Sequence, residues 1–401
     1  MKHLFLSLVL TASILNPLLH HAQTQNEVPE VPYFTFGRGL GIISPDSLFL
    51  LNIRFRIQNR VAFTTQSAND WEIESVEARV RRMRLRFDGY IYTKRLSYVM
   101  QLSFSRGDMD FEDTAFPNVV RDAMVLYAVN NKFTIGLGQT KLPGNRQRVV
   151  SSGDLQLPDR SIVNATFNID RDFGLQLYYT NHINGFYYLL RGALTSGEGR
   201  NITSSDKGLA YTGRIELLPF GLFTNFGDYF EGDLMREPKP KLSMGLTHSE
   251  NYGAIRAGGQ LGKFLYDSRD ISTSIADLLI KYRGFAMAAE LLYRTTDNPL
   301  TFSDTGDLRY VYKGFGETYQ GSYLFHNNFE IAARFARVIP HNELQQYESE
   351  TTHYTLGATK YLKGHRVKLQ SDLTYETREW LLNANSNTDN FQIRFQIEIG
   401  I

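Results

Sequence analysis

The chain ends in Phe391-Gln-Ile-Arg-Phe-Gln-Ile-Glu-Ile-Gly-Ile401, in which an apolar residue occupies every second position. Gln392, Arg394, Gln396 and Glu398 lie between these apolar residues. A period of two is typical of a β-strand with one apolar and one polar face, because successive side chains point to opposite sides. The strand alone suits a soluble sandwich, whose apolar face is the core, or a membrane barrel, whose apolar face meets lipid.

The same pattern recurs from about residue 48 onward, and the number of repeats favours the barrel. We predict sixteen strands, near residues 48–63, 80–92, 95–106, 122–130, 132–141, 172–182, 185–196, 208–218, 240–250, 273–283, 285–295, 315–326, 328–338, 352–362, 366–378 and 390–401. Tight turns are expected at Thr93-Lys94-Arg95, Asn130-Asn131, Asn184-Gly185, Arg283-Gly284, Asn327-Asn328 and Lys363-Gly364. Long polar loops lie between them, and both termini are then periplasmic. The predicted fold is all-β, a 16-stranded antiparallel transmembrane β-barrel with short periplasmic turns and long extracellular loops.

The composition agrees with a barrel and excludes several other classes. The 401 residues are 42% hydrophobic and 21% charged and contain no cysteine, which excludes disulfide scaffolds, thiolate metal sites and cysteine nucleophiles. Beyond the first 20 or so residues no run of about 18 apolar residues occurs, which excludes a helical membrane protein. One uncharged row is predicted to face lipid, namely Phe285, Met287, Ala289, Leu291 and Tyr293. The 27 phenylalanines and 23 tyrosines gather near strand ends, where interfacial aromatic girdles are expected.

The N-terminus has the layout of a secretory signal peptide. Lys2 precedes an apolar run over residues 4–15, and Ala22 precedes the expected cleavage site. We therefore divide the chain into a signal peptide at 1–22, an N-terminal periplasmic segment at 23–47 and a transmembrane barrel domain at 48–401. Export and the barrel together predict the bacterial outer membrane, with its lipid as a partner. The 43 basic and 42 acidic residues nearly cancel, so any preference for charged solutes depends on where the charges lie.

The polar faces of the first two predicted strands carry an unusual number of arginines. If the apolar residues of each strand face lipid, six arginines face the lumen, namely Arg54, Arg56 and Arg60 in the first strand and Arg82, Arg84 and Arg86 in the second. A guanidinium stays charged at any workable pH and presents a planar fork of donors that suits phosphate or carboxylate oxygens. These rows predict an anion-attracting stripe along one wall. Arg79 and Arg81 fall on or near the outer face and are expected near lipid head groups.

Lumen-facing arginines can also serve a purely structural role. In that interpretation they pair with carboxylates across the wall, and inward candidates are Asp277, Glu290, Glu330, Asp372, Glu376 and Glu398. Two adjacent strands with six arginines and few carboxylates between them favour the anion-attracting stripe. The sequence leaves open whether each arginine is free or paired.

Several segments resemble a known family of outer-membrane proteins. Residues 80–90 (VRRMRLRFDGY), 138–143 (GQTKLP), 157–164 (LPDRSIVN) and 167–176 (FNIDRDFGLQ) resemble the phosphate-selective porin O and P family. The resemblance extends over about residues 40–401 and is most specific at 80–176. It implies a sixteen-stranded barrel, usually a homotrimer, with an arginine-lined passage and a constriction where loops fold into the lumen. It also implies a porin that carries small anions such as phosphate or polyphosphate.

The resemblance also suggests which residues form the constriction. Residues 141–172 correspond to the infolded loop, and its candidate residues are Lys141, Arg146, Arg148, Ser151, Ser152, Arg160 and Arg171, beside the strand arginines Arg82, Arg84 and Arg86. An alternative is that Asp159, Arg160, Asp170, Arg171 and Asp172 form a salt-bridge lattice that holds the loop. No cluster of lysines corresponds to the constriction of the family, so phosphate specificity is less firmly implied than anion preference.

The sequence offers no catalytic or cofactor site. No Gly-x-Ser-x-Gly elbow and no Ser-His pair with an orienting third group can be recognised, and no histidine spacing suggests a metal site. No phosphate-cradling glycine loop and no nucleic-acid-binding pattern is present. We therefore expect no enzyme and no cofactor. Two classes remain, a diffusive anion-preferring porin, which is favoured, and a closed or loop-plugged barrel with a structural or adhesive role.

Overall fold

The protein is described by a computed structural model that covers residues 33–35, 39–108, 118–202 and 208–401. The predicted signal peptide at residues 1–22 lies outside these described residues. No helix within them is long and apolar enough to cross a membrane.

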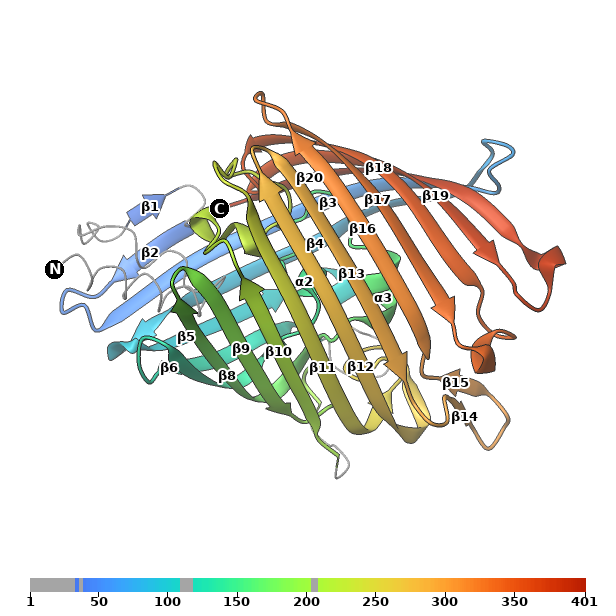
Figure 1. The fold of residues 1–401 in the computed structure, drawn as a ribbon, viewed down its shortest axis with the longest axis horizontal. Coiled ribbons are helices and arrows are strands. Elements are labelled where there is room, and N and C mark those ends of the chain that lie inside the picture. The colour runs from blue at the N-terminus through green and yellow to red at the C-terminus, as the bar shows by residue number, and fades with distance from the viewer. Residues whose placement is uncertain (1–32, 36–38, 109–117, 203–207) are drawn as a thin grey trace.

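Sixteen antiparallel strands form one closed barrel (Figure 1). In chain order they are β3 (Phe49–Thr65), β4 (Ile73–Ile91), β5 (Thr93–Ser103), β6 (Val120–Ala128), β7 (Phe133–Lys141), β8 (Arg171–Ile183), β9 (Phe186–Thr195), β10 (Ala210–Leu218), β11 (Lys241–Arg256), β12 (Phe264–Tyr282), β13 (Phe285–Thr295), β16 (Gly314–Leu324), β17 (Phe329–Pro340), β18 (Glu350–Lys363), β19 (Val367–Glu379) and β20 (Thr388–Gly400). Each strand pairs with its neighbours in the sequence, and β20 closes the ring by pairing with β3 from Gln392↔Thr64 to Gly400↔Arg56. The predicted fold class is confirmed.

The barrel turns its apolar rows outward. In β13, Phe285 and Tyr293 are exposed whereas the alternating Ala286 and Leu292 are buried. A further outward row crosses five strands as a chain of ring contacts, with centroids 5.0–6.3 Å apart, formed by Trp71, Phe391, Tyr375, Tyr354, Phe335 and Tyr319. Large exposed apolar side chains on a continuous outer wall are expected where lipid rather than water is the neighbour.

One predicted turn lies elsewhere, and another is found as expected. The β4–β5 turn lies at Tyr92, with φ of 67°, rather than at Thr93-Lys94-Arg95. Asn184 and Gly185 form the predicted tight turn, with φ of 49° and 85°, the left-handed conformation that two-residue hairpin turns require. Additional short strands are β1 (Tyr33–Thr35), β2 (Gly39–Ile43), β14 (Leu300–Phe302) and β15 (Leu308–Tyr310).

The periodicity argument was wrong for Arg79 and Arg81. The register of β3 with β4 shifts between Gln58↔Arg82 and Asn59↔Val80, so Arg81 is the extra residue of a β-bulge. Beyond the bulge, Arg79 lies opposite the inward-facing Arg60, and Val80 takes the outer face. Because a bulge shifts the alternation by one residue, it turns both arginines away from lipid. Arg81 instead pairs with Asp159 in the lumen, at 3.0 Å.

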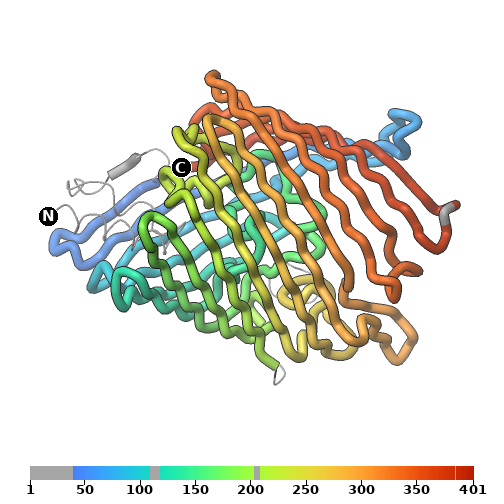
Figure 2. The backbone as a smooth tube through the Cα atoms, viewed as in Figure 1, coloured from blue at the N-terminus to red at the C-terminus, as the bar shows by residue number. Residues whose placement is uncertain are grey.

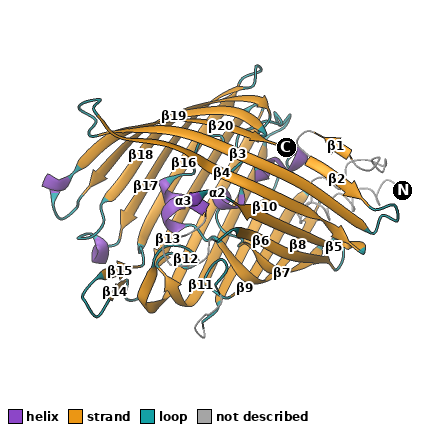
Figure 3. Ribbon diagram, turned by 180° about the vertical axis from the view of Figure 1, so that it is seen from behind, coloured by secondary structure: helices purple, strands orange, loops and turns teal. Residues whose placement is uncertain are grey.

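Two chain segments fill much of the lumen. Residues 142–170, between β7 and β8, contain the short helices α2 (Arg146–Val149) and α3 (Ile162–Phe167), which lie between the barrel walls in Figure 3. Val163 and Phe167 of α3 pack against inward-facing Ile275, Leu292 and Ala336. Residues 219–240, between β10 and β11, contain the 3₁₀ helix η2 (Thr224–Tyr229), and the backbone tube of Figure 2 shows this yellow-green segment near the C-terminus. Phe223 packs on inward-facing Leu189, Leu218 and Leu279.

Candidate pore constriction

The predicted arginine rows lie side by side on the β3–β4 hairpin. Arg54 is directly opposite Arg86, Arg56 is opposite Arg84, and Gln58 is opposite Arg82. Directly opposed like charges destabilise a pair of strands, so the surrounding groups must compensate for them. The number and position of the carboxylates around these arginines therefore decide how much positive potential remains at the wall.

Three aspartates form ion pairs with the arginines of β3 and β4, and each aspartate pairs with more than one arginine. Asp88 pairs with both Arg54 and Arg86. Asp108, in the 3₁₀ helix η1 (Arg106–Asp108), pairs with Arg84 at 2.7 Å and Arg121 at 2.8 Å. Although burial opposes ionisation, these two guanidiniums hold the pKa of the Asp108 carboxyl well below its usual value.

The third aspartate, Asp159, lies in the segment 142–170 and joins this segment to the wall. It pairs with Arg60, with Arg81 at 3.0 Å and with Arg82 at 3.2 Å. Burial disfavours its charge, but Arg81, Arg82 and Arg60 together hold its pKa well below the usual value. Asp159 also lies 4.0 Å from Arg394 of β20. Among the described residues, eight arginines therefore share Asp88, Asp108 and Asp159, and two of them have a further carboxylate, Glu77 at 2.8 Å from Arg60 and Asp372 at 2.6 Å from Arg394. The arginines are paired, as the structural interpretation requires, yet they outnumber their partners.

The segment 142–170 also meets the arginine wall through hydroxyl groups. Arg56 and Arg84 donate to Ser152 Oγ at 2.8 and 2.7 Å. Ser151 Oγ accepts a weaker bond from Arg56, at 3.4 Å. Neutral acceptors orient a guanidinium without cancelling its charge, so the contact preserves the positive potential of this wall.

Lys141, at the end of β7, and Arg160, within the segment 142–170, both donate to backbone carbonyls of this segment. Lys141 Nζ donates to the carbonyls of Val149 and Val150, at 2.9 and 3.2 Å. Arg160 donates to the carbonyl of Val150 at 2.7 Å and to that of Gln147. Burial and the charge of nearby Arg171 lower the pKa of Arg160 to about 10, whereas the carboxylates of Glu231 and Asp159 oppose this change, so Arg160 stays charged at neutral pH.

The remaining charged residues of the predicted loop either form ion pairs or accept hydrogen bonds from neighbouring hydroxyl and amide groups. Arg148 pairs with Asp170, and Arg171 pairs with Asp122 at 2.9 Å. Asp172 accepts from the Ser196 hydroxyl and the Gly197 amide, at 2.7 and 2.6 Å. The salt-bridge lattice therefore describes Arg171, Asp170 and Asp159, but it does not describe Arg160, which donates to carbonyl groups.

Arg146 lies on the opposite side of the lumen from the arginine wall. It donates to Glu216 and Ser243, both at 2.6 Å, and lies 3.4 Å from Asp277. Arg214 also pairs with Glu216 and Asp277. The lumen thus has an acidic wall on β10–β12, and Arg146 anchors the infolded segment to it.

The segment 219–240 approaches the same region from the rim of short turns. The amide of Glu231 donates to the Asp154 carbonyl at 2.8 Å, and the Glu231 carboxylate accepts from the Gln156 amide at 3.0 Å. Lys281 Nζ, on β12, donates to the carbonyls of Gly227 and Phe230, at 2.5 and 2.7 Å, and to that of Gly232. The two segments are therefore bonded to each other as well as to the walls.

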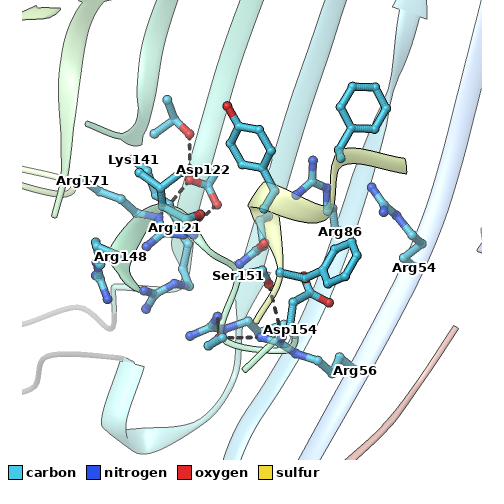
Figure 4. A pocket seen from close by; sticks show the side chains of 18 of the residues that line it. Arg54, Arg56, Arg86, Arg121, Asp122, Lys141, Arg148, Ser151, Asp154 and Arg171 are labelled. Atoms are coloured by element: carbon cyan, nitrogen blue, oxygen red, sulfur yellow. Dashed lines mark hydrogen bonds and ion pairs between the residues drawn. The ribbon is translucent and has the colours of Figure 1, made fainter. Parts of the chain in front are cut away.

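A cavity of about 380 Å³ remains between these parts, and cations dominate its lining. Ten arginines and Lys141 line it, against Asp122 and Asp154, and the arginines are Arg54, Arg56, Arg84, Arg86, Arg121, Arg148, Arg160, Arg171, Arg191 and Arg366. Figure 4 shows Arg121, Lys141, Arg148 and Arg171 on one side of the cavity and Arg54 and Arg86 on the other. The site is a vestibule ringed by guanidinium groups.

The structure brings most of the predicted site residues to this vestibule. Of the candidates, those that line it are Arg54, Arg56, Arg84, Arg86, Lys141, Arg148, Ser151, Ser152, Arg160 and Arg171. Arg60 and Arg82 lie beside Asp159 instead, and Arg146 lies at the acidic wall.

Sequence reasoning missed Arg121, Arg191, Arg366 and the whole segment 219–240. Arg121 is the extra residue of a bulge, because Gln101↔Asp122 is followed by Leu102↔Val120. Strict alternation cannot place two consecutive residues on one face, so periodicity overlooks such a side chain. The segment 219–240 had a visible signal: it is a long connection on the rim where the other connections are tight turns.

Fold and site together define the class: an outer-membrane β-barrel of the porin type, with sixteen strands and an infolded loop in its lumen. The model of the family described as phosphate-selective porin O and P matches residues 51–220, which include the arginine wall and the infolded segment. This match confirms the expected resemblance over residues 51–220, whereas the sequence had suggested about residues 40–401. It also supports the predicted location in the outer membrane and a channel rather than an enzyme.

Solved structures with the same fold have distant sequences. An anion-selective porin from Comamonas acidovorans has a TM-score of 0.52 at 14% identity, covering 88% of this chain and 99% of its own. The outer membrane channel DcaP of Acinetobacter baumannii has a TM-score of 0.54 at 11% identity, over 90% and 99% of the two chains. OprB of Pseudomonas putida has a TM-score of 0.55 at 8% identity, over 88% and 94%. No curated protein sequence matches the chain. At these identities the likeness concerns the fold alone.

Proposed function

We propose that this protein is a passive channel for small hydrophilic solutes that prefers anions. The observation that carries the proposal is the lining of the vestibule, in which eleven cationic side chains meet two aspartates. The aspartates behind the lining are shared among several arginines, so pairing reduces the positive charge without cancelling it. One unit charge at 4 Å contributes about 1 kcal/mol in water and several times more in a partly desolvated passage. Such a field biases ion traffic toward anions.

Phosphate or polyphosphate is the cargo that the family match suggests. The guanidinium fork matches the oxygen geometry of phosphate, and several forks converge on this vestibule. The constriction would be formed by residues 142–170, supported by their bonds to the walls, and Arg54, Arg56, Arg84 and Arg86 would contact the passing anion.

The reversal potential of the purified protein in a planar bilayer under a KCl gradient tests the anion preference. Arg366 suits a variant, because no described carboxylate lies within ion-pair distance of it, yet it lines the vestibule. We expect anion selectivity that weakens in Arg366→Gln and is retained in Arg378→Gln, a matched change on the exposed end of β19. Current block by low phosphate would support the phosphate cargo. Cation selectivity of the unmodified protein would contradict the proposal.

A loop-plugged barrel without a transport role is the second candidate. The bonds that join Glu231 to Asp154 and Gln156 favour it, because they link the two lumen segments directly. A bilayer that stays silent with folded protein would support this candidate over the porin.

We further propose that the protein assembles as a homotrimer through the outer faces of β9–β12. A hydrogen-bonded polar cluster faces outward there, in which the His248 ring contacts Ser274 Oγ at 2.9 Å and Glu250 at 2.7 Å. The outward Tyr211 and Tyr252 stack edge to face beyond it toward the loops. Polar groups on a lipid-facing wall are costly, so a second copy of the chain covering this face would stabilise it.

A further inference from the structure

The vestibule has an aromatic side that a simple inorganic anion would not use. Tyr178 on β8 and Phe226, Tyr229 and Phe230 of the segment 219–240 line it together with the cations. The volume of about 380 Å³ is within the range of small-molecule sites, which combine apolar walls with a few convergent polar groups. A hydrated inorganic ion gains nothing from such a wall, because its affinity comes from charge and hydrogen bonds.

The aromatic rings are held in place by cations outside the arginine wall. The Arg191 guanidinium carbon lies 5.5 Å from the Tyr229 ring centre, and Arg191 also donates to the Tyr229 hydroxyl. Lys281 Nζ lies 4.3 Å from the Phe230 ring centre while it binds the backbone carbonyls of the segment. Cation–π contacts of this kind fix a ring without covering both of its faces. The aromatic side of the vestibule is therefore preorganised in the absence of a solute.

The cationic side retains hydrogen-bonding capacity for an anion. Arg366 lines the cavity, and no carboxylate of the described residues lies within ion-pair distance of its guanidinium. Arg56 and Arg84 share the neutral Ser152 hydroxyl as an acceptor. An oxygen-bearing anion in the cavity supplies acceptors that suit the guanidinium fork.

We propose that the vestibule binds organic anions that carry an aromatic body, with aromatic carboxylates as the substrate class. The carboxylate accepts from guanidinium groups of the lining such as that of Arg366, and the ring packs against Tyr178, Phe226 and Phe230. The inference rests on the proposed anion-preferring channel and adds the chemistry of its cargo. It predicts that affinity depends on the body of the solute as well as on its charge.

Binding to the full-length protein in detergent tests the inference without requiring any current. Calorimetric titrations with benzoate, acetate and inorganic phosphate compare an aromatic anion with two anions that lack a ring. Burial of the ring should lower the dissociation constant of benzoate by roughly tenfold or more relative to acetate. Equal affinity for benzoate and acetate, or tighter binding of phosphate than of benzoate, would overturn the inference.

Two variants separate the aromatic side from the cationic side. Phe226→Ala should weaken benzoate severalfold and leave phosphate binding unchanged, whereas Arg86→Gln should weaken both. Phe325→Ala is the matched control, because Phe325 is exposed on the rim and does not line the vestibule. Fluorine NMR line widths of 4-fluorobenzoate provide a second readout, and each variant is first checked for the heat-modifiable electrophoretic mobility of a folded barrel.

The failure of this inference is distinguishable from the failure of the proposed function. Tight benzoate binding by a protein that gives no current would support the aromatic site and contradict the channel. Anion-selective current that benzoate blocks no better than acetate would support the channel and contradict the aromatic site.

Discussion

Arg56 and Arg84 lie directly opposite each other on the β3–β4 hairpin, and both guanidiniums donate to the single hydroxyl oxygen of Ser152. Two like charges thus converge on one neutral acceptor from the infolded segment. Each arginine has a different carboxylate as its ion-pair partner: Glu398 lies 3.6 Å from Arg56, and Asp108 lies 2.7 Å from Arg84. The hydroxyl orients the two arginines toward the vestibule and ties the segment to the wall.

Ser152→Ala should destabilise the folded barrel. Two buried guanidinium donors lose their shared acceptor, and a hydrogen bond to a charged group contributes about 1.5–3 kcal/mol. Urea unfolding in detergent, followed by tryptophan fluorescence, measures the loss. Ser151→Ala is the matched control, since Ser151 Oγ accepts only long bonds, from Arg56 at 3.4 Å and from the Gly153 amide at 3.3 Å. Equal losses in the two variants would contradict the role of Ser152.

Asp108→Asn should make the channel more anion-selective and less stable at once. The change leaves Arg84 and Arg121 without their common carboxylate, and breaking a buried ion pair costs about 3–5 kcal/mol. The reversal potential and the unfolding midpoint are measured on the same preparation. Asp267→Asn, at a side chain that is 68% exposed, should change neither quantity.

Lys281→Met should release the segment 219–240 from the wall. The ammonium group donates to three of its backbone carbonyls, and methionine keeps the length of the side chain without any donor. We expect faster proteolytic cleavage between residues 219 and 240 and a larger single-channel conductance. Lys239→Met lies in the same segment at an exposed position and should leave both properties unchanged. Unchanged cleavage in Lys281→Met would show that other contacts hold the segment.

The docking of this segment should weaken as the pH rises through about 6. Burial, together with the nearby charge of Glu216, raises the pKa of the Asp228 carboxyl to about 6, from an ordinary value near 3.8. The folded protein then retains a proton that the unfolded chain has released, so Asp228 favours the docked state at low pH and loses this contribution between about pH 4 and 6. Arg146, Arg191 and Tyr229 also face this carboxyl.

Hydrogen exchange of residues 219–240 at pH 5 and pH 7, corrected for intrinsic rates, measures this effect. Protection should be greater at pH 5, and Asp228→Asn should remove the difference. Asp304→Asn, at an exposed position outside the lumen, should leave the difference intact. Greater protection at pH 7 would reverse the sign and contradict the assignment.

Gly213→Trp should disrupt the proposed trimer. An added Cβ at Gly213 meets nothing within 4 Å, and the residue lies on the outer face of β10 opposite His248. The indole would therefore leave the barrel intact and protrude into the partner subunit. Gly321→Trp, an equally open glycine on the outer face of β16, is the control. Native mass spectrometry that gives the same oligomer for both variants would move the interface elsewhere.

The regular wall of the barrel could be predicted from the sequence, because each strand repeats one physical rule. Apolar residues such as Phe395 and Ile397 must meet lipid, and a period of two then places Gln396 inside. The same rule predicted that Arg54 and Arg86 share a face. Periodicity could not predict pairing between distant residues, such as that of Asp159, whose partners come from three strands far away in the sequence.

The parts that sequence reasoning missed have two physical causes. One extra residue in a strand reverses its alternation, which is how Arg81 and Arg121 both turned toward the lumen. The fold of the segment 219–240 depends on partners supplied by the barrel, such as Lys281, rather than on a local pattern. Such a segment contains no periodicity, and its length and position were the only signal.

The short strand β2 lies end to end with the last strand of the barrel. It pairs with β3 from Leu40↔Ile53 to Ile43↔Leu50, whereas β20 reaches only to Arg56. Gly39 allows this approach, because a Cβ there would lie 2.2 Å from the carbonyl oxygen of Ile53. Without β2, residues 50–53 of β3 would present unpaired backbone donors and acceptors on this side. Such open edges recruit strands from other chains. The strand β2 therefore completes the pairing of β3 at this point of the barrel and protects it against edge-to-edge aggregation during assembly.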